Sequence, residues 1–193
     1  MTMTQVLDPP PQSGAFAQGN AVAAGPPALI AGESPDAYEE LLLRVANALQ
    51  PADVLEEIWI RDVVDLVWEA SRLRRLKVQL MSAAAHEGMA DVLRPLMAVA
   101  GQSEAIAKKW AAGEDPAVLQ QVESAIGKAG LTMDAVAART LSVRIADFER
   151  IERMLMAAEA RRAAALHQLD RHRENFGLRL RCTLQAIEEG RPR

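Results

Sequence analysis

Residues 132–189 read TMDAVAARTLSVRIADFERIERMLMAAEARRAAALHQLDRHRENFGLRLRCTLQAIEE and decide the fold. The segment has no proline and one glycine, Gly177, and its apolar residues recur at intervals of seven. The first row is Leu141, Phe148, Leu155, Leu169 and Phe176, and the second is Ile151, Ala158 and Ala165. Because this is the spacing of a coiled-coil or bundle seam, we predict one long amphipathic helix over 132–189, roughly 80–90 Å long at 1.5 Å per residue.

The rest of the ordered chain also has helical signals. Half of all residues are hydrophobic and 4% are aromatic, which predicts a globular but thin, helix-packed core. Ser34 and Pro35 are suited to start a first helix. Asp53 is suited to cap a second helix, which runs from Val54 towards Ser82. Gly88 and Pro95 are expected to interrupt the segment that follows. Further short helices are expected up to Leu131, so residues 33–131 are predicted to form a helical bundle region.

No segment alternates apolar and polar residues between turn residues, as a strand would. The predicted fold class is therefore all-α: an irregular helical bundle with one long C-terminal coiled-coil-like helix and a disordered N-terminal leader. The leader, residues 1–32, is rich in proline and glycine and lacks apolar periodicity. Residues 1–32 are interpreted either as a solvated tail without a function or as a flexible arm that contacts a partner. Residues 190–193 are expected to be a short tail.

The helix after Asp53 carries the broadest apolar face of the chain, which predicts contact with more than one neighbouring helix. Trp59 and Leu66 share this face with Leu55, Leu73 and Leu80. We therefore expect Trp59 and Leu66 to be buried and to anchor the core rather than to bind a ligand.

Motifs for catalysis and metal binding are incomplete. His86-Glu87 begins like a zinc-protease motif, but the second histidine would fall at Ala90. His167 and His172 are five residues apart, which is too far round a helix to share a metal. Cys182 is the only cysteine, so an intrachain disulfide and a thiolate cluster are both excluded. We predict a non-enzymatic protein with no catalytic, cofactor-binding or metal-binding residues.

No apolar stretch approaches the ~18–20 residues that span a bilayer, and residues 1–32 lack the features of a secretory signal. The expectations are a cytoplasmic protein and no membrane partner.

The long helix suggests association with another helix. The face that would form the helix interface carries Phe148, Ile151, Leu155, Leu169 and Phe176. The first hypothesis is therefore a protein–protein interaction or self-association module, with a homo-oligomer or a helical protein as partner. Arg162 and His172 interrupt this face, and an alternative is that the helix breaks near Gly177 and folds back, burying the stripe within one chain.

Arginines on the same segment support a second hypothesis. Those that could contact phosphate are Arg161, Arg162, Arg171, Arg173, Arg179 and Arg181. A basic helix face could track a nucleic-acid backbone, although arginine also coats the outside of many helices. The alternative function is thus a nucleic-acid-associated accessory protein. The formal net charge of −4 weighs against an indiscriminate nucleic-acid binder.

Several stretches carry a family resemblance. They are Gly32–Leu41, Leu49-Gln50-Pro51, Leu55-Glu56-Glu57, Ala129–Asp134, Ile151–Met154, Ala158–Arg162 and Leu169–Arg173. In these the chain resembles a family of uncharacterised helical proteins common in alphaproteobacteria, many of which have a basic N-terminal segment where this chain has its proline-rich leader. The resemblance implies no activity, ligand or site residue.

Overall fold

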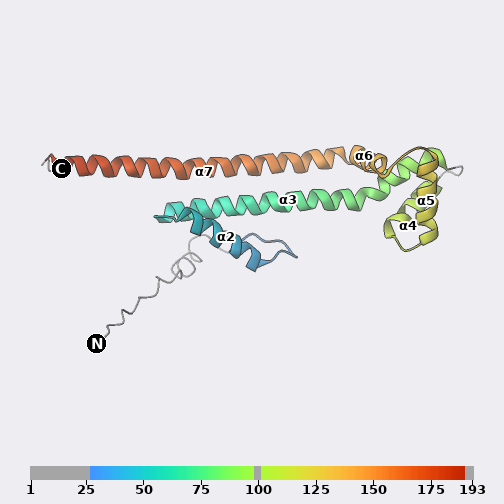
Figure 1. Cartoon of the computed structure of the whole chain (residues 1–193), viewed down its shortest axis with the longest axis horizontal. Coiled ribbons are helices and arrows are strands. Elements are labelled where there is room, and N and C mark those ends of the chain that lie inside the picture. Colours follow the sequence, from blue (N-terminus) through green and yellow to red (C-terminus); the bar gives the residue numbers. More distant parts are fainter. Residues whose placement is uncertain (1–26, 98–100, 190–193) are drawn as a thin grey trace, which may run out of the picture. The chain divides into compact units, whose positions relative to one another are not determined.

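The computed structural model describes residues 27–97 and 101–189, and every regular element in these ranges is helical (Figure 1). The elements are α2 (Pro35–Leu49), α3 (Val54–Leu93), a 3₁₀ turn η1 (Arg94–Leu96), α4 (Gln102–Ala112), α5 (Pro116–Lys128), α6 (Met133–Val143) and α7 (Ile145–Glu188). The predicted all-α class and long C-terminal helix are confirmed. Residues 1–26 of the predicted leader and the tail at 190–193 lie outside the described residues.

The chain divides into two compact units. Unit 1 contains residues 1–65 and 162–193, and unit 2 contains residues 66–161. Each unit therefore combines segments that are far apart in the sequence, and α3 and α7 contribute to both.

Unit 1 is built from α2, the beginning of α3 and the second half of α7. The Ser34 side chain accepts a hydrogen bond from the Ala37 amide at 3.2 Å, and Pro35 occupies the first turn of α2, as expected of a capped helix start. The Tyr38 hydroxyl donates to Asp65 Oδ1 at 2.5 Å. The buried apolar residues are Tyr38, Leu42, Ala46, Ile60, Val63, Val64, Ala165 and Leu169.

Unit 2 has its main core where the end of α3 meets α4, α5 and α6. The buried members are Met89, Ala90, Leu93, Ile106, Ala107, Val118, Val122, Ile126 and Val136. A smaller cluster joins α3 and α7 through Ala70, Leu73 and Leu155, with Ile151 packed against it. Apolar residues at helical spacing thus account for both clusters.

The single helix predicted over 132–189 is instead two helices that separate at Arg144. Arg144 leaves helical geometry (φ −107°, ψ 20°), and its guanidinium is bound to the Glu87 carboxylate of α3. The Thr140 hydroxyl donates to the Val136 carbonyl four residues earlier, a bond that often accompanies helix bending. The break therefore comes from tertiary contacts, because the local sequence has neither glycine nor proline. The alternative break near Gly177 is wrong, since α7 is continuous through it.

Gly88 does not interrupt α3, which continues to Leu93. A Cβ atom at Gly88 would lie 2.1 Å from Thr140 Oγ1, 2.6 Å from Thr140 N and 2.7 Å from the Val136 carbonyl oxygen. Glycine is needed here because α6 packs its backbone directly on α3. Trp59 and Leu66 are only partly buried, which corrects the expectation that both are buried.

We expect Gly88→Ala to lower the free energy of unfolding by about 1–3 kcal/mol. The new methyl group would clash with backbone atoms that cannot move away by side-chain rotation, although alanine favours a helix by about 1 kcal/mol over glycine. Chemical denaturation monitored by circular dichroism measures the change. Gly127→Ala is the matched control, because a Cβ there meets nothing within 4 Å and should be neutral or stabilising. Equal effects of the two changes would contradict the close contact between α3 and α6.

Candidate helix interface at the end of α7

The five residues predicted to form a helix interface have two different environments. Phe148, Leu155 and Leu169 are buried, and Ile151 is partly buried, within the units to which they belong. Phe176 is 62% exposed. The first four positions are thus covered by the chain itself, and of the five only Phe176 presents most of its surface for a partner.

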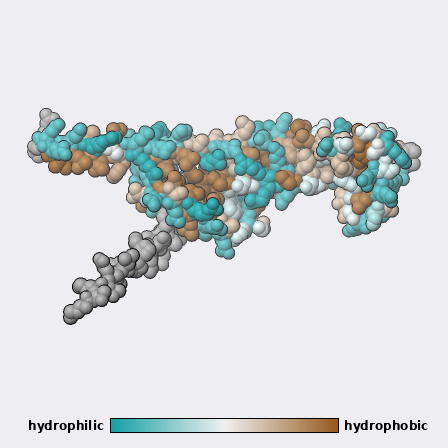
Figure 2. Space-filling model, in the orientation of Figure 1, coloured by the Kyte–Doolittle hydropathy of each residue, from teal (hydrophilic) through white to brown (hydrophobic). Residues whose placement is uncertain are grey.

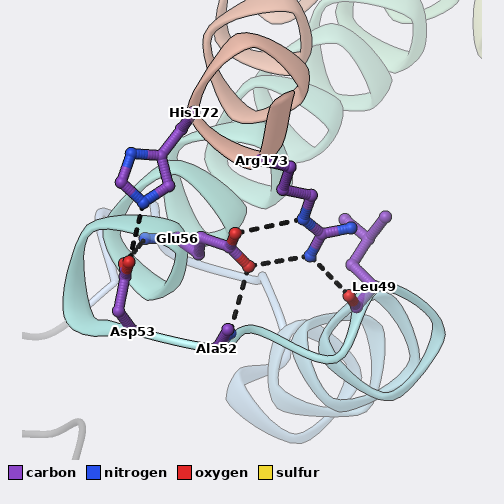
Figure 3. Close-up of polar contacts among 6 residues, drawn as sticks. All are labelled: Leu49, Ala52, Asp53, Glu56, His172 and Arg173. Carbon is purple, nitrogen blue, oxygen red and sulfur yellow. Dashed lines mark hydrogen bonds and ion pairs between the residues drawn. The ribbon is translucent and has the colours of Figure 1, made fainter. Parts of the chain in front are cut away.

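Just before Phe176, α7 is fastened to the rest of unit 1 by Arg173 (Figure 3). Its guanidinium donates to both Glu56 carboxylate oxygens, from Nε at 3.1 Å and from Nη2 at 2.8 Å, and Nη2 also donates to the Leu49 carbonyl at 2.6 Å. The same Glu56 carboxylate accepts from the Ala52 amide at 3.0 Å. One side chain therefore joins α7 to the first turn of α3 and to the last turn of α2, whose carbonyls lack intrahelical partners.

This arrangement explains how the Glu56 side chain, only 3% exposed, can be charged. The Arg173 hydrogen bonds lower the pKa of Glu56 more than burial raises it, and Glu56 in turn raises the pKa of Arg173. A bidentate arginine–carboxylate pair is among the stronger charged contacts in proteins. We call Arg173, Glu56 and their backbone partners the α7 clamp.

His172 lies beside the clamp and contacts Asp53 (Figure 3). Its Nε2 is 2.7 Å from Asp53 Oδ2, and its ring meets the Trp59 ring edge-on with centroids 5.2 Å apart. Asp53 also caps α3 as predicted, because its Oδ1 accepts from the Glu56 amide at 3.0 Å. The Glu56 amide and, secondarily, His172 lower the pKa of Asp53. The clamp and the capping contact together fix α7 against the start of α3.

Beyond the clamp, α7 continues past the first residue of α3 within unit 1 (Figure 1). Four large apolar side chains line this segment, with exposed fractions of 62% at Phe176, 51% at Leu180, 51% at Leu184 and 69% at Ile187. At about 100° per residue, the last three lie roughly 40°, 80° and 20° round the helix from Phe176. Figure 2 shows the hydrophobic side of this end of α7. We call these four residues the apolar stripe.

The apolar stripe continues the face that α7 uses inside unit 1. On the same scale, buried Leu169 and clamped Arg173 lie about 20° and 60° from Phe176. Among the described residues, the face is therefore covered by α3 as far as Arg173 and exposed from Phe176 onward. Leu178, which is 53% exposed, lies about 200° away on the opposite side and is not part of the stripe.

A cleft of about 450 Å³ lies where the clamp meets the stripe. Its walls are Leu49, Gln50, Ala52, Asp53, Glu56, His172, Arg173, Phe176 and Gly177. The charged groups on its walls already bind one another. Phe176 supplies the apolar part of the wall next to these paired charges.

The six arginines named as phosphate contacts do not gather on one face. Arg173 binds Glu56, and Arg161 binds Glu69 at 3.1 Å. The other four are spread round α7, since Arg162, Arg171, Arg179 and Arg181 lie at about 40°, 220°, 300° and 140° from Phe176. Arg162 is on the side that packs inside the chain and is only partly exposed. These six arginines therefore supply scattered positive charges and do not form a continuous basic face.

A second cleft, of about 350 Å³, occurs in unit 2 and includes the His86-Glu87 pair singled out in the sequence. Glu87 is bound by Arg144, whose contact lowers the Glu87 pKa, and Asp91 is bound by Arg94 at 2.5 Å and Arg139 at 2.8 Å. These carboxylates hold helices together. Within residues 27–97 and 101–189, no three histidine, cysteine or acidic side chains are placed to hold a metal ion.

Protein-family models, curated proteins and solved structures all give no match to this chain. The described helices include none that is long and apolar enough to cross a membrane. The resemblance to alphaproteobacterial proteins therefore stays a prediction, and only the geometry of the chain bears on its function.

The sequence pattern does not identify the clamp. It groups Arg173 with phosphate-binding arginines and marks His172 only as an interruption of the seam. Their partners lie 117 and 119 residues away. Two signals were available in the sequence. His172 and Arg173 interrupt the apolar face of the long helix, and the acids Asp53 and Glu56 lie at a predicted helix start. The second signal is weak, because acidic residues are common at helix starts for purely local reasons.

Proposed function

We propose that this chain is a non-enzymatic helical protein that associates with another protein through the apolar stripe at the end of α7. The observation that carries the proposal is the exposure of four large apolar side chains on one face of a single helix. Four such side chains, each half to two-thirds exposed, present roughly 400 Å² of contiguous apolar surface, a size often functional in monomeric proteins.

The clamp supports this function physically. Because Arg173 and His172 fasten α7 immediately before the stripe, the projecting segment is held on a fixed base. A preorganised helix loses less conformational entropy on binding than a free peptide does. An amphipathic helix from the partner, laid along residues Phe176–Ile187, would bury the stripe in the manner of other helix-in-groove contacts.

Photo-cross-linking tests the proposal without assuming the identity of the partner. A photoreactive phenylalanine analogue replaces Leu180 in one variant and Leu178 in a matched control, and each is irradiated in the cells that produce the protein. We expect one discrete cross-linked adduct from position 180 and little from position 178, with the attached peptides identified by mass spectrometry. No adduct from position 180, or equal adducts from both positions, would overturn the proposal.

The nucleic-acid alternative receives less support from the geometry, because two of the six arginines are paired and the rest point in different directions. Phosphate-driven binding loses orders of magnitude in affinity between low and physiological salt, whereas burial of an apolar face depends little on salt. Titrating the purified chain with a labelled duplex at two salt concentrations separates the two functions. Tight, strongly salt-dependent binding would favour the alternative.

A further inference from the structure

We infer that the partner covering the apolar stripe is a second copy of this chain, paired antiparallel about a two-fold axis that passes between Arg181 and Cys182 of each copy. This inference rests on the proposed function and specifies its partner. Three features of unit 1 lead to it: the position of α3, the spacing of the stripe and the length of α7 that remains uncovered.

The position of α3 decides the direction of pairing. The stripe lies on the same face of α7 that α3 and α2 cover up to Arg173. If two copies paired in parallel, the α3 helices of both copies would compete for the space between the two α7 helices. In an antiparallel pair, the α3 helices lie at opposite ends of the contact, and neither obstructs the other copy.

The spacing of the stripe is self-complementary in the antiparallel direction. The midpoint of Phe176 and Ile187 falls between positions 181 and 182, and the midpoint of Leu180 and Leu184 falls at position 182, half a residue away. A two-fold axis between positions 181 and 182 places Phe176 of one copy opposite Ile187 of the other, and Leu180 within one residue, about 1.5 Å along the axis, of Leu184. All four stripe residues of each copy are then matched by an apolar residue, which a shift of one helical turn would not achieve.

The uncovered length of α7 fits the same register. The clamp places Arg173 level with Glu56 in the first turn of α3. From Phe176 to the last helical residue, Glu188, α7 has no neighbour from α3. With the axis at positions 181–182, Glu188 of one copy falls opposite Asn175 of the other, next to the level at which α3 begins. The end of the second helix would thus fill the space beyond the N-terminus of α3.

The buried area is sufficient for a reversible dimer. Two stripes bury roughly 800 Å² of apolar surface, and the aliphatic stems of flanking side chains such as Arg179 add to it. The total is near the 1,000–1,200 Å² at which specific interfaces begin. We therefore expect a dissociation constant in the micromolar range, because association entropy offsets most of the gain from burial.

Distances between spin labels test the pairing with the stripe intact. One sample carries the label on native Cys182, which is exposed, and a second carries it on Arg171→Cys in a Cys182→Ser background. Positions 182 and 171 lie about 240° and 220° round the helix from Phe176, so both labels are on the outer sides of the pair. The antiparallel axis places the two Cys182 labels at nearly the same level, so the helix spacing of about 8–10 Å, the helix radii and the reach of the labels set their distance. It places the labels at position 171 about 32 Å apart along the helix axis.

A short distance at position 182 together with a long distance at position 171, in full-length protein at about 100 μM, would support the inference. Short distances at both positions would show a parallel pair and overturn it. No dipolar coupling at either position would show that the chain does not pair with itself, which also overturns it. In that last case a cross-linked adduct with a different protein from position 180 would still support the proposed function, so the two failures are distinguishable.

Discussion

Leu180→Glu is expected to convert the proposed dimer into a monomer, weakening self-association at least 100-fold. The change removes an apolar contact at the centre of the stripe and places a carboxylate opposite Leu184 of the other copy. Burying an unpaired charge among apolar side chains is costly, and a loss of about 2.8 kcal/mol already corresponds to a factor of 100. Sedimentation equilibrium over a range of concentrations measures the dissociation constant.

Leu178→Glu is the matched control for this prediction. It is the same substitution on the same helix at a residue of nearly equal exposure, 53% against 51%, but on the opposite side of α7. We expect it to leave the dissociation constant within about threefold, and both variants to keep the helical circular dichroism of the wild type. A dimer that survives Leu180→Glu, or one that is lost equally in both variants, would contradict the role of the stripe.

Arg173→Ala is expected to lower the free energy of unfolding by about 3 kcal/mol, the lower part of the range for breaking one side of a buried ion pair. The substitution leaves the Glu56 carboxylate 3% exposed and without its main counter-charge, and it removes the donor to the Leu49 carbonyl. The lower part of the range applies because Arg173 itself is 39% exposed. Urea denaturation monitored by circular dichroism gives the value.

Arg171→Ala serves as the control, since Arg171 is exposed and projects away from the clamp. It should change the free energy of unfolding by no more than about 0.5 kcal/mol. A loss similar to that of Arg173→Ala would mean that positive charge on α7, rather than the clamp, supplies the stability.

The contribution of the clamp should depend on pH in a defined direction. Arg173 lowers the pKa of Glu56 in the folded state, whereas glutamate in an unfolded chain titrates near pH 4.3. The unfolded state therefore takes up the proton first as the pH falls, so the stabilisation is present above about pH 4.3 and is lost below it as folded Glu56 becomes protonated. The difference between wild type and Arg173→Ala should shrink below pH 4 and be constant near pH 7.

The sequence was sufficient for the fold class and for much of the buried face of α7. Phe148, Leu155 and Leu169 were identified by a seven-residue spacing, because a helix face that packs against another must be apolar at that period. Periodicity reports that a face is covered, but it does not say by what. The pattern therefore fits contact with a partner as well as contact within the chain, and the structure shows that these residues are buried within the chain.

Other features depended on tertiary contacts that leave little trace in local sequence. The apolar spacing runs smoothly across Arg144, and only the approach of α6 to Gly88 and the contact with Glu87 account for the break. The sequence predicts a helix interruption at the same glycine, whereas in the structure its small size allows two helix backbones to meet. At the candidate site, helical spacing extends the apolar face from Phe176 through Leu180, Leu184 and Ile187, but the position of the first residue of α3 determines which part of this face is exposed.

Amide hydrogen exchange of the wild-type chain, monitored by mass spectrometry as a function of protein concentration, tests the central claim most directly because it locates the contact surface without altering any residue. Exchange is compared at concentrations well below and well above the expected micromolar dissociation constant. We predict that exchange in residues 176–188 slows at the higher concentration, while exchange in residues 162–173, already covered by α3, stays the same. Exchange in 176–188 that is independent of concentration, or slowing confined to another part of the chain, would contradict the account.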